Sequence, residues 1–160
     1  MPSQQGDVSL LEHPLAQELL HAPIPARLAY TWKDGTPRVV PIWFHWTGQE
    51  LVLGSPPKAP KVLILPDHPQ VALTIDSNDW PYKTLLIRGI ASIQTVEGVA
   101  PEYAAAAERY FGEAQGRAWV EQVRAMSAQM TRIAVRPTWV GLLDFQTRFP
   151  SAIEAAMVGA

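Results

Sequence analysis

A tight turn at Asp34-Gly35 limits the folds open to this chain more than any other short segment does. The turn joins two stretches rich in aromatic and β-branched residues, Arg27–Trp32 and Thr36–Trp46, and an Asp-Gly pair in that position is a strong signal for a β-hairpin turn. A second turn at Thr47-Gly48-Gln49 leads into a third predicted strand, Glu50–Ser55. Because hairpins join antiparallel neighbours, this region predicts an antiparallel sheet.

The rest of the chain adds more strands and a group of helices. Four further strands are predicted, with a bulge or bend at Gly89: Gln70–Asp76, Tyr82–Val96, Thr131–Val135 and Thr138–Asp144. Helical patterns cover Leu10–His21 (capped by Ser9), Ala59–Leu65, Pro101–Tyr110 and Arg117–Ala128. Many short strands joined by hairpins favour a barrel over a parallel sheet. We therefore expect a mainly β fold, an antiparallel, Greek-key-like barrel with flanking helices.

The length of 160 residues fits a single domain, residues 1–160, that is large enough to bury a core. Within it we expect a loose N-terminal arm over residues 1–8, a helix over 9–21, a helical insertion over 100–128 and a C-terminal tail over 146–160. The N-terminus lacks the basic start and apolar stretch of a signal peptide, and no apolar run is long enough to span a bilayer. We therefore expect a cytoplasmic protein with no membrane partner.

Composition excludes several classes of site. The chain has no cysteine, which removes thiol catalysis and cysteine-based metal sites, and its four histidines follow no metal-ligand spacing. The net charge of −2 and the scattered basic residues argue against a nucleic-acid partner. Hydrolase, P-loop and dinucleotide-fold motifs are absent from the sequence. No metal is predicted and no side chain is assigned a catalytic role, so a cofactor has to supply any chemistry.

The segment from Asp34 to Lys61 predicts a site for a flat, phosphorylated cofactor. The apolar strand Arg38–His45 can present main-chain N–H and C=O groups to an aromatic ring system. Ser55, Lys58 and Lys61 follow at the start of a short helix, where backbone amides and cationic side chains favour an anion. Two lysines in a surface loop are also commonly just solvated. The adjacent apolar strand and the proline-stiffened loop shift the balance towards a flavin-type cofactor.

The six tryptophans give a second group of candidates. Trp43 and Trp46 lie on opposite faces of their strand, so one face meets the core and the other meets a ligand or a second subunit. A barrel core plus a dimer interface explains any single one of them equally well. Trp80 lies in a polar loop, where it can cover a planar ligand or anchor a partner chain.

Three segments resemble the flavin-binding split β-barrel proteins related to pyridoxamine 5′-phosphate oxidase: DGTPRVVPIWF, LVLGSPPKAPKVLILPDHPQVAL and LLIRGIASI. The closing segment RIAVRPTWVGLLDF also resembles members of the wider flavin/deazaflavin group, so the likeness runs from about Arg27 to Phe145. The resemblance implies a split barrel of six to eight strands and a homodimer with two cofactor sites at the subunit interface.

The resemblance also implies a set of cofactor-binding residues. In relatives, the strand matching Arg38–Trp43 lines the isoalloxazine through its backbone, and residues matching Ser55 and Lys61 hold the phosphate. Thr84 is expected near the flavin ring of the partner chain. Position 60 is proline where many FMN-binding relatives have arginine, and Lys58 is the candidate to replace that charge. The full set is Arg38, Val39, Val40, Pro41, Ile42, Trp43, Gly54, Ser55, Lys58, Pro60, Lys61, Thr84 of the partner, and Trp80.

The function implied is an FMN-dependent oxidoreductase that transfers a hydride at flavin N5 to or from an unidentified small molecule. The alternatives are a reductase that uses the deazaflavin F420 and a non-catalytic protein that binds flavin or haem, with His13, His21 or His68 as the axial ligand. A barrel that has lost its ligand and persists as a dimeric scaffold is a further possibility. The arginine and histidine with which pyridoxamine phosphate oxidases hold the substrate phosphate are missing late in this sequence, which ends FQTRFPSAIEAAMVGA.

Overall fold

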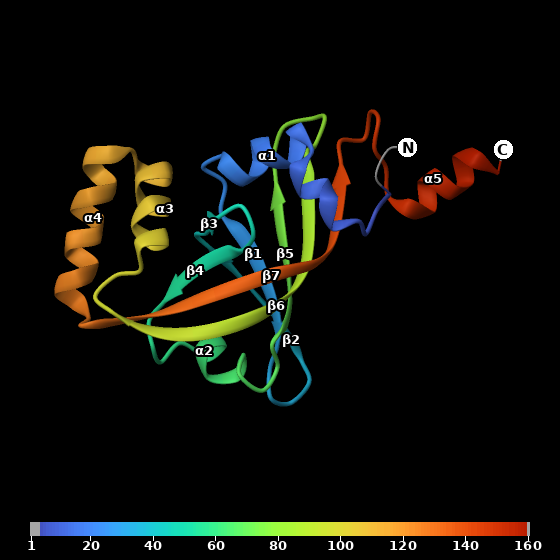
Figure 1. The fold of residues 1–160 in the computed structure, drawn as a ribbon. Coiled ribbons are helices and arrows are strands. Elements are labelled where there is room, and N and C mark those ends of the chain that lie inside the picture. The colour runs from blue at the N-terminus through green and yellow to red at the C-terminus, as the bar shows by residue number, and fades with distance from the viewer. Residues whose placement is uncertain (1–3, 160) are drawn as a thin grey trace.

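Two long strands, β6 (Thr84–Glu97) and β7 (Gln129–Leu143), run side by side through the centre of the computed structural model, which describes residues 4–159 (Figure 1). They belong to a seven-stranded sheet in the order β2-β1-β5-β6-β7-β4-β3, and every neighbouring pair is antiparallel. The other strands are β1 (Ala26–Thr31), β2 (Pro37–Ile42), β3 (His45–Trp46), β4 (Leu51–Ser55) and β5 (Gln70–Asp76). The expected antiparallel, mainly β fold is confirmed.

The sheet closes into a barrel because its two end strands are almost consecutive in the chain. β2 and β3 lie at opposite ends of the strand order, yet only Trp43 and Phe44 separate them. So short a link spans roughly 10 Å at most, and the sheet must curl until its ends approach each other. Phe44 is fully buried at this link. The single strand expected over Thr36–Trp46 is therefore wrong, because the chain leaves one end of the sheet at Trp43 and joins the other at His45.

Alternating apolar residues of the strands fill the barrel. Leu28 of β1, Leu53 of β4 and Ile87 of β6 are each almost completely buried, and α1 (Pro14–His21) adds Leu19 and Leu20 from one end. α2 (Pro60–Ile64) lies at the other end (Figure 1). This packing produces one continuous hydrophobic core.

A second, smaller core lies outside the barrel, between the sheet and a helical hairpin. The hairpin consists of α3 (Pro101–Phe111) and α4 (Glu113–Met126), and this core is centred on Val99, Ala100, Ala107, Val120 and Met130. Gly116 lets the helices approach closely, because a Cβ there would lie 2.6 Å from Glu108 Cα. The expected helical insertion is present, although α4 begins at Glu113 and not at Arg117.

The bulge expected at Gly89 is present. The β6–β7 register shifts between Arg88 and Gly89, where Arg88 pairs with Trp139 and Gly89 pairs with Pro137. A Cβ at Gly89 would lie 2.5 Å from Arg136 O, so glycine permits this close approach. Because the bulge accommodates Pro137, β7 continues as one strand where the sequence predicted two.

The N-terminal region differs from its prediction. A 3-10 helix, Val8–Glu12, precedes α1, and its N-cap is Asp7, whose Oδ1 accepts a hydrogen bond from Ser9 N; the Ser9 cap is therefore wrong. A new helix starts at Pro14, which has no N–H to continue the first. The segment expected as a loose arm is attached to β7. Gln5 Nε2 donates to Leu142 O, Gln5 Oε1 accepts from Leu142 N, and Gly6 N donates to Val140 O. Residues 1–3 lie outside the described part of the chain.

The C-terminal tail contains a helix that the sequence did not predict, α5 (Ser151–Val158), which extends away from the barrel (Figure 1). The turn before it is organised by the Asp144 carboxylate, which accepts hydrogen bonds from the amides of Gln146, Thr147 and Arg148 and from the Thr147 hydroxyl. Burial opposes ionisation of Asp144, but these bonds outweigh it and hold its pKa well below the usual value. Among residues 4–159, no helix has the length and apolar character needed to cross a membrane.

Candidate functional site

The strand expected to face a ring system, β2, is an end strand with one open edge. It pairs with β1 on one side and has no strand partner on the other among the described residues. Val39 is 69% exposed, and Arg38 stacks over the Trp32 ring at 4.0 Å. The open edge leaves main-chain N–H and C=O groups available to a ligand.

A cavity of about 370 Å³ lies where β2 ends. It is lined by Pro25, Pro41, Ile42, Trp43, Gly54 and Tyr103. It thus gathers Pro41, Ile42 and Trp43 with Gly54 of β4, four of the residues that the sequence named. The cavity falls in the size range of pockets that hold small molecules and cofactors.

Aromatic side chains from the helical hairpin form the wall behind this cavity. Tyr110 stacks on Trp43, with ring centroids 4.9 Å apart and planes at 15°, and Phe111 meets Trp43 edge-on at 4.8 Å. Tyr103 and Trp119 complete the cluster, and Trp119 Nε1 donates to Tyr103 Oη at 2.9 Å. Sequence reasoning missed these residues, although four aromatic residues within two alanine-rich helices were a visible signal.

Arg109 fixes the hairpin to the turn between β2 and β3. Its guanidinium donates hydrogen bonds to Ala22 O and Phe44 O and lies over the Phe44 and Tyr110 rings. Glu102 of α3 is held in the same region by Arg132, whose Nη2 is 2.7 Å from Glu102 Oε1. The Arg132 hydrogen bond lowers the Glu102 pKa more than burial raises it.

Ser55, the expected phosphate contact, ends β4 with a buried hydroxyl. The residue is 2% exposed, and its Oγ donates only a long hydrogen bond, 3.4 Å, to Pro56 O. A second cavity of about 330 Å³ opens beside it, lined by Gly54, Ser55, Pro56, Tyr103, Trp119, Val123, Met126, Ser127, Gln129 and Met130. We call this the hairpin pocket. It shares Gly54 and Tyr103 with the first cavity, so the two cavities are neighbours.

The two lysines expected near the phosphate have no carboxylate within 4.0 Å among residues 4–159. Lys58 is exposed, whereas Lys61 is half-buried and its pKa is lowered by that burial. Neither lysine lines the two cavities at Gly54. The helix that begins at Pro60 has only five residues, and the Val62 and Leu63 amides bond to Ala59 O. The lysine side chains are therefore better placed to donate hydrogen bonds to an anion than the helix amides that the sequence suggested.

Thr84 and Trp80 lie far from this group within one chain. Ser55 pairs with Thr131, which pairs with Thr95, and Thr84 lies eleven residues back along β6, roughly 35 Å at the usual strand rise. Trp80 lies just before Thr84, 63% exposed, with its ring against Tyr82 and Phe145. Neither residue can contact a ligand at Gly54 of its own chain, so their contribution from a partner stays a prediction.

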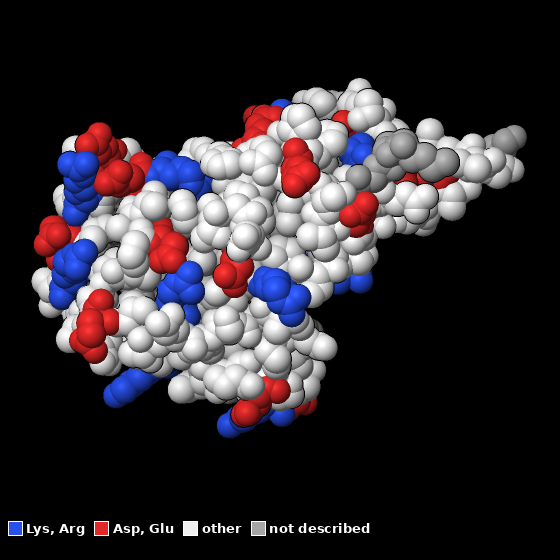
Figure 2. Space-filling model, viewed as in Figure 1, with Lys and Arg blue, Asp and Glu red and all other residues white. Residues whose placement is uncertain are grey.

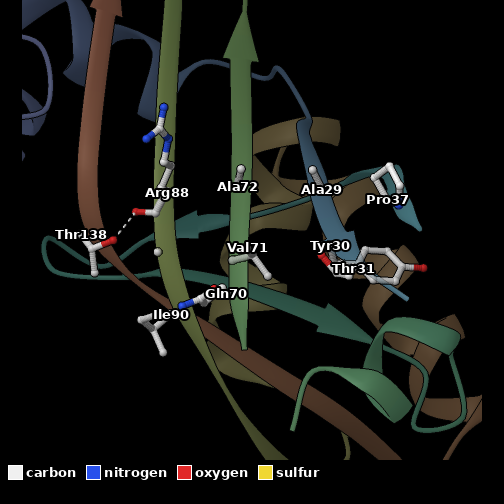
Figure 3. Close-up of a pocket in the computed structure, with 11 residues that line it drawn as sticks. Ala29, Tyr30, Thr31, Pro37, Gln70, Val71, Ala72, Arg88, Ile90 and Thr138 are labelled. Carbon is white, nitrogen blue, oxygen red and sulfur yellow. Dashed lines mark hydrogen bonds between the residues drawn. The ribbon is translucent and has the colours of Figure 1, made fainter. Parts of the chain in front are cut away.

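The open face of β1, β5 and β6 carries a groove of about 420 Å³ (Figure 3). Its lining includes the small side chains of Ala29 and Ala72 and the longer Arg88, which stacks on Trp139 at 4.0 Å. By contrast, the surface of the α3–α4 hairpin carries both signs of charge, as in the Arg117–Glu113 pair (Figure 2). No group of three metal-binding side chains occurs within residues 4–159.

A family model for pyridoxamine 5′-phosphate oxidase matches residues 13–144. A solved structure named F420 reductase is 27% identical with a TM-score of 0.60, and the match covers 78% of this chain and 94% of that one. No curated protein matches the chain.

Two more distant structures share the fold. A conserved hypothetical protein from Mycobacterium tuberculosis is 17% identical with a TM-score of 0.67, covering 91% of each chain. The haem storage protein HutZ from Vibrio cholerae is 18% identical with a TM-score of 0.59, covering 82% of this chain and 93% of that one. Proteins named for different cofactors are thus similar to this chain, so the choice of cofactor has to be argued from the residues at the site.

Proposed function

Because this chain belongs to the pyridoxamine 5′-phosphate oxidase family, we propose that it is a flavin-dependent oxidoreductase that binds FMN between the β2 edge and Ser55. The observation that carries the proposal is Lys61, a half-buried cation with no carboxylate partner among the described residues, six positions after a buried serine hydroxyl. Partial burial makes the charged form of Lys61 less favourable and lowers its pKa, and an anionic ligand would offset that cost. A phosphate would supply both the negative charge and the acceptors that Lys61 and Ser55 lack.

The chain's own residues would bind and orient the cofactor and keep water away from it. The open edge of β2 offers main-chain donors and acceptors in a fixed plane, and Trp43 is held rigidly by Tyr110 and Phe111. Bound FMN would supply the hydride-transfer chemistry at its N5. The small-molecule substrate remains unidentified, and no side chain of the described residues is assigned as its acid or base.

F420 is the second candidate cofactor, because the structure named F420 reductase is the 27% identical one. F420 carries a long anionic tail, which requires an open and basic exit from the site. Lys58 is exposed and unpaired among the described residues, and it could meet such a tail. The compact spacing of Lys58 and Lys61 favours FMN.

We also propose that the protein is a homodimer with each site completed by the partner. In support, Thr84 and Trp80 are too far from Gly54 to act within one chain, and the sheet face around Ala72 presents small side chains that a second copy could cover. The exposed Trp80 and Tyr82 rings add apolar surface near Thr84.

The test is an ultraviolet–visible spectrum of the purified protein, followed by separate fluorescence titrations with FMN and F420. Saturable FMN binding at about one per chain, weakened about ten-fold or more by Lys61→Ala, is the expected result. Lys33→Ala, an exposed lysine in the β1–β2 turn, is the control. A folded protein that binds neither cofactor, or an FMN affinity unchanged by Lys61→Ala, would contradict the proposal.

A further inference from the structure

The hairpin pocket is a second cavity beside Ser55, and the FMN proposed above does not account for it. Its walls are mainly apolar and aromatic: Tyr103, Trp119, Val123, Met126 and Met130. Met126 is 69% exposed at its rim, an unusual exposure for a large apolar side chain beside a cavity. The Trp119–Tyr103 hydrogen bond fixes the orientation of two of the rings.

The pocket begins at the residue that is expected to receive the phosphate. Ser55 lines it directly, and Gly54 lies between it and the cavity at Pro41–Trp43. At the end of β4, Gly54 therefore lines both the cavity at Pro41–Trp43 and the hairpin pocket, and Ser55 lines the hairpin pocket. A group attached to a phosphate at Ser55 would enter the hairpin pocket next.

The chemistry of the lining selects among such groups. An oligoanionic tail such as that of F420 is a poor match for walls of valine, methionine and tryptophan. A purine ring matches them, since bases stack on aromatic side chains and thioethers make favourable contacts with ring edges. Ser127 and Gln129 are polar side chains of the lining. Ser127 Oγ donates to Gln129 O and Gln129 Nε2 donates to Glu97 Oε1, so the Gln129 side-chain oxygen is the group that can accept a hydrogen bond from the amino group of a base.

We propose that the hairpin pocket binds the adenine of FAD, so that the flavin held by this chain is the dinucleotide. The proposal rests on the proposed function and deepens it, because FAD contains the FMN unit and continues from its phosphate. Lys58, exposed and without a carboxylate partner in the described chain, is the candidate to meet the second phosphate.

The experiment compares FAD and FMN affinities, measured by flavin and tryptophan fluorescence, for the intact chain and for Met126→Asp. We expect FAD to bind at least about ten-fold more tightly than FMN, because the stacked base adds affinity. Met126→Asp places a carboxylate at the pocket rim and should remove most of that difference by weakening FAD. Val123→Trp, which fills the pocket with an apolar ring, should have the same effect and guards against misfolding of the first variant.

The matched control is Met157→Asp in α5, where a methionine that is 60% exposed lies outside the pocket lining. It should leave both affinities unchanged. Equal binding of FAD and FMN, or an equal loss of both in Met126→Asp and Val123→Trp, would overturn this inference and leave the proposed function standing. Failure of a folded protein to bind either flavin would overturn both.

Discussion

Lys61 carries a charge that no carboxylate of the described chain neutralises. Partial burial lowers the pKa of Lys61 below its ordinary value of 10.5, so the protonated side chain reduces the stability of the folded state at neutral pH. Ser55 is a second polar group with few partners, since its hydroxyl is buried and its one hydrogen bond within the described chain, to Pro56 O, is long at 3.4 Å. Residues in this condition are expected where a ligand completes the site.

Lys61→Met should therefore change stability and binding in opposite directions. Without cofactor, the variant should melt at a slightly higher temperature than the original protein at neutral pH, because a half-buried charge with no carboxylate partner has been removed. FMN affinity should fall about ten-fold or more with the loss of a charge-assisted hydrogen bond. Calorimetry and fluorescence titration measure the two effects.

The sign of the pH dependence follows from the lowered pKa. Between the folded-state pKa of Lys61 and 10.5 the unfolded chain binds more protons, so the stability of the original protein rises with pH through that window. The gap in stability between Lys61→Met and the original protein should narrow there. A variant that is less stable than the original at neutral pH would refute the unpaired-charge argument.

At the scale of elements, the α3–α4 hairpin turns an ordinary barrel into one with two cavities. It supplies Tyr103, which lines both cavities, and Tyr110, which stacks on Trp43. Gly54 permits this arrangement, since a Cβ there would lie 2.5 Å from Tyr103 Cδ2. Arg109 anchors the hairpin to two backbone carbonyls, those of Ala22, which precedes β1 in the chain, and of Phe44, which follows β2.

Arg109→Lys should destabilise the protein although it keeps the charge. An ammonium group cannot reproduce the planar fork that bonds two carbonyls while lying on the Phe44 and Tyr110 rings, so buried carbonyls lose partners. The expected loss is about 2 kcal/mol in urea unfolding. Arg117→Lys, at an exposed ion pair with Glu108 and Glu113, should stay within about 0.5 kcal/mol. Equal effects of the two substitutions would show that Arg109 does not anchor the hairpin.

At the scale of the whole molecule, closure of the barrel forms the cavity, whereas the open sheet face is available to a second copy of the chain. Closure through Trp43 and Phe44 brings the end of β2 and the end of β4 to one cavity. The face of β1, β5 and β6 stays open, with a groove lined by Ala29, Ala72 and Arg88 (Figure 3). A second copy covering that face would remove its apolar surface from water, and the proposed shared site requires that this copy also bring its Thr84 to the cofactor.

Ala72→Arg should convert the expected dimer to a monomer, because a long cation replaces a small side chain in the middle of that face. Size-exclusion chromatography with light scattering at micromolar concentration measures the change, and circular dichroism should show an intact fold. FMN affinity should fall together with the dimer fraction if Thr84 acts from the partner. Ala125→Arg, on the exposed side of α4, is the control. An original protein that is already monomeric and still binds FMN would contradict the shared site.

Local patterns in the sequence were sufficient for the elements of the barrel. The alternation in Gln70–Asp76 and the turn at Asp34-Gly35 predicted strands and pairing that the structure confirms, and Gly89 marked the bulge. Such signals work because strand period and turn geometry depend on residues a few positions apart. They failed at Thr36–Trp46, where an unbroken apolar pattern concealed a change from one end of the sheet to the other, and in the C-terminal tail, where α5 buries no apolar face.

The sequence by itself thus determined the mainly antiparallel β fold and the family, and it predicted a cofactor site in the segment from Asp34 to Lys61. Only the tertiary structure decided that Trp43 meets Tyr110 and that Gly54 meets Tyr103, contacts between residues about fifty or more positions apart. Alternation specifies which face of a strand a residue occupies, but not which helix will cover that face. The hairpin pocket exists because α3 and α4 pack over the end of β4, and the adenine that we propose for it depends on that packing.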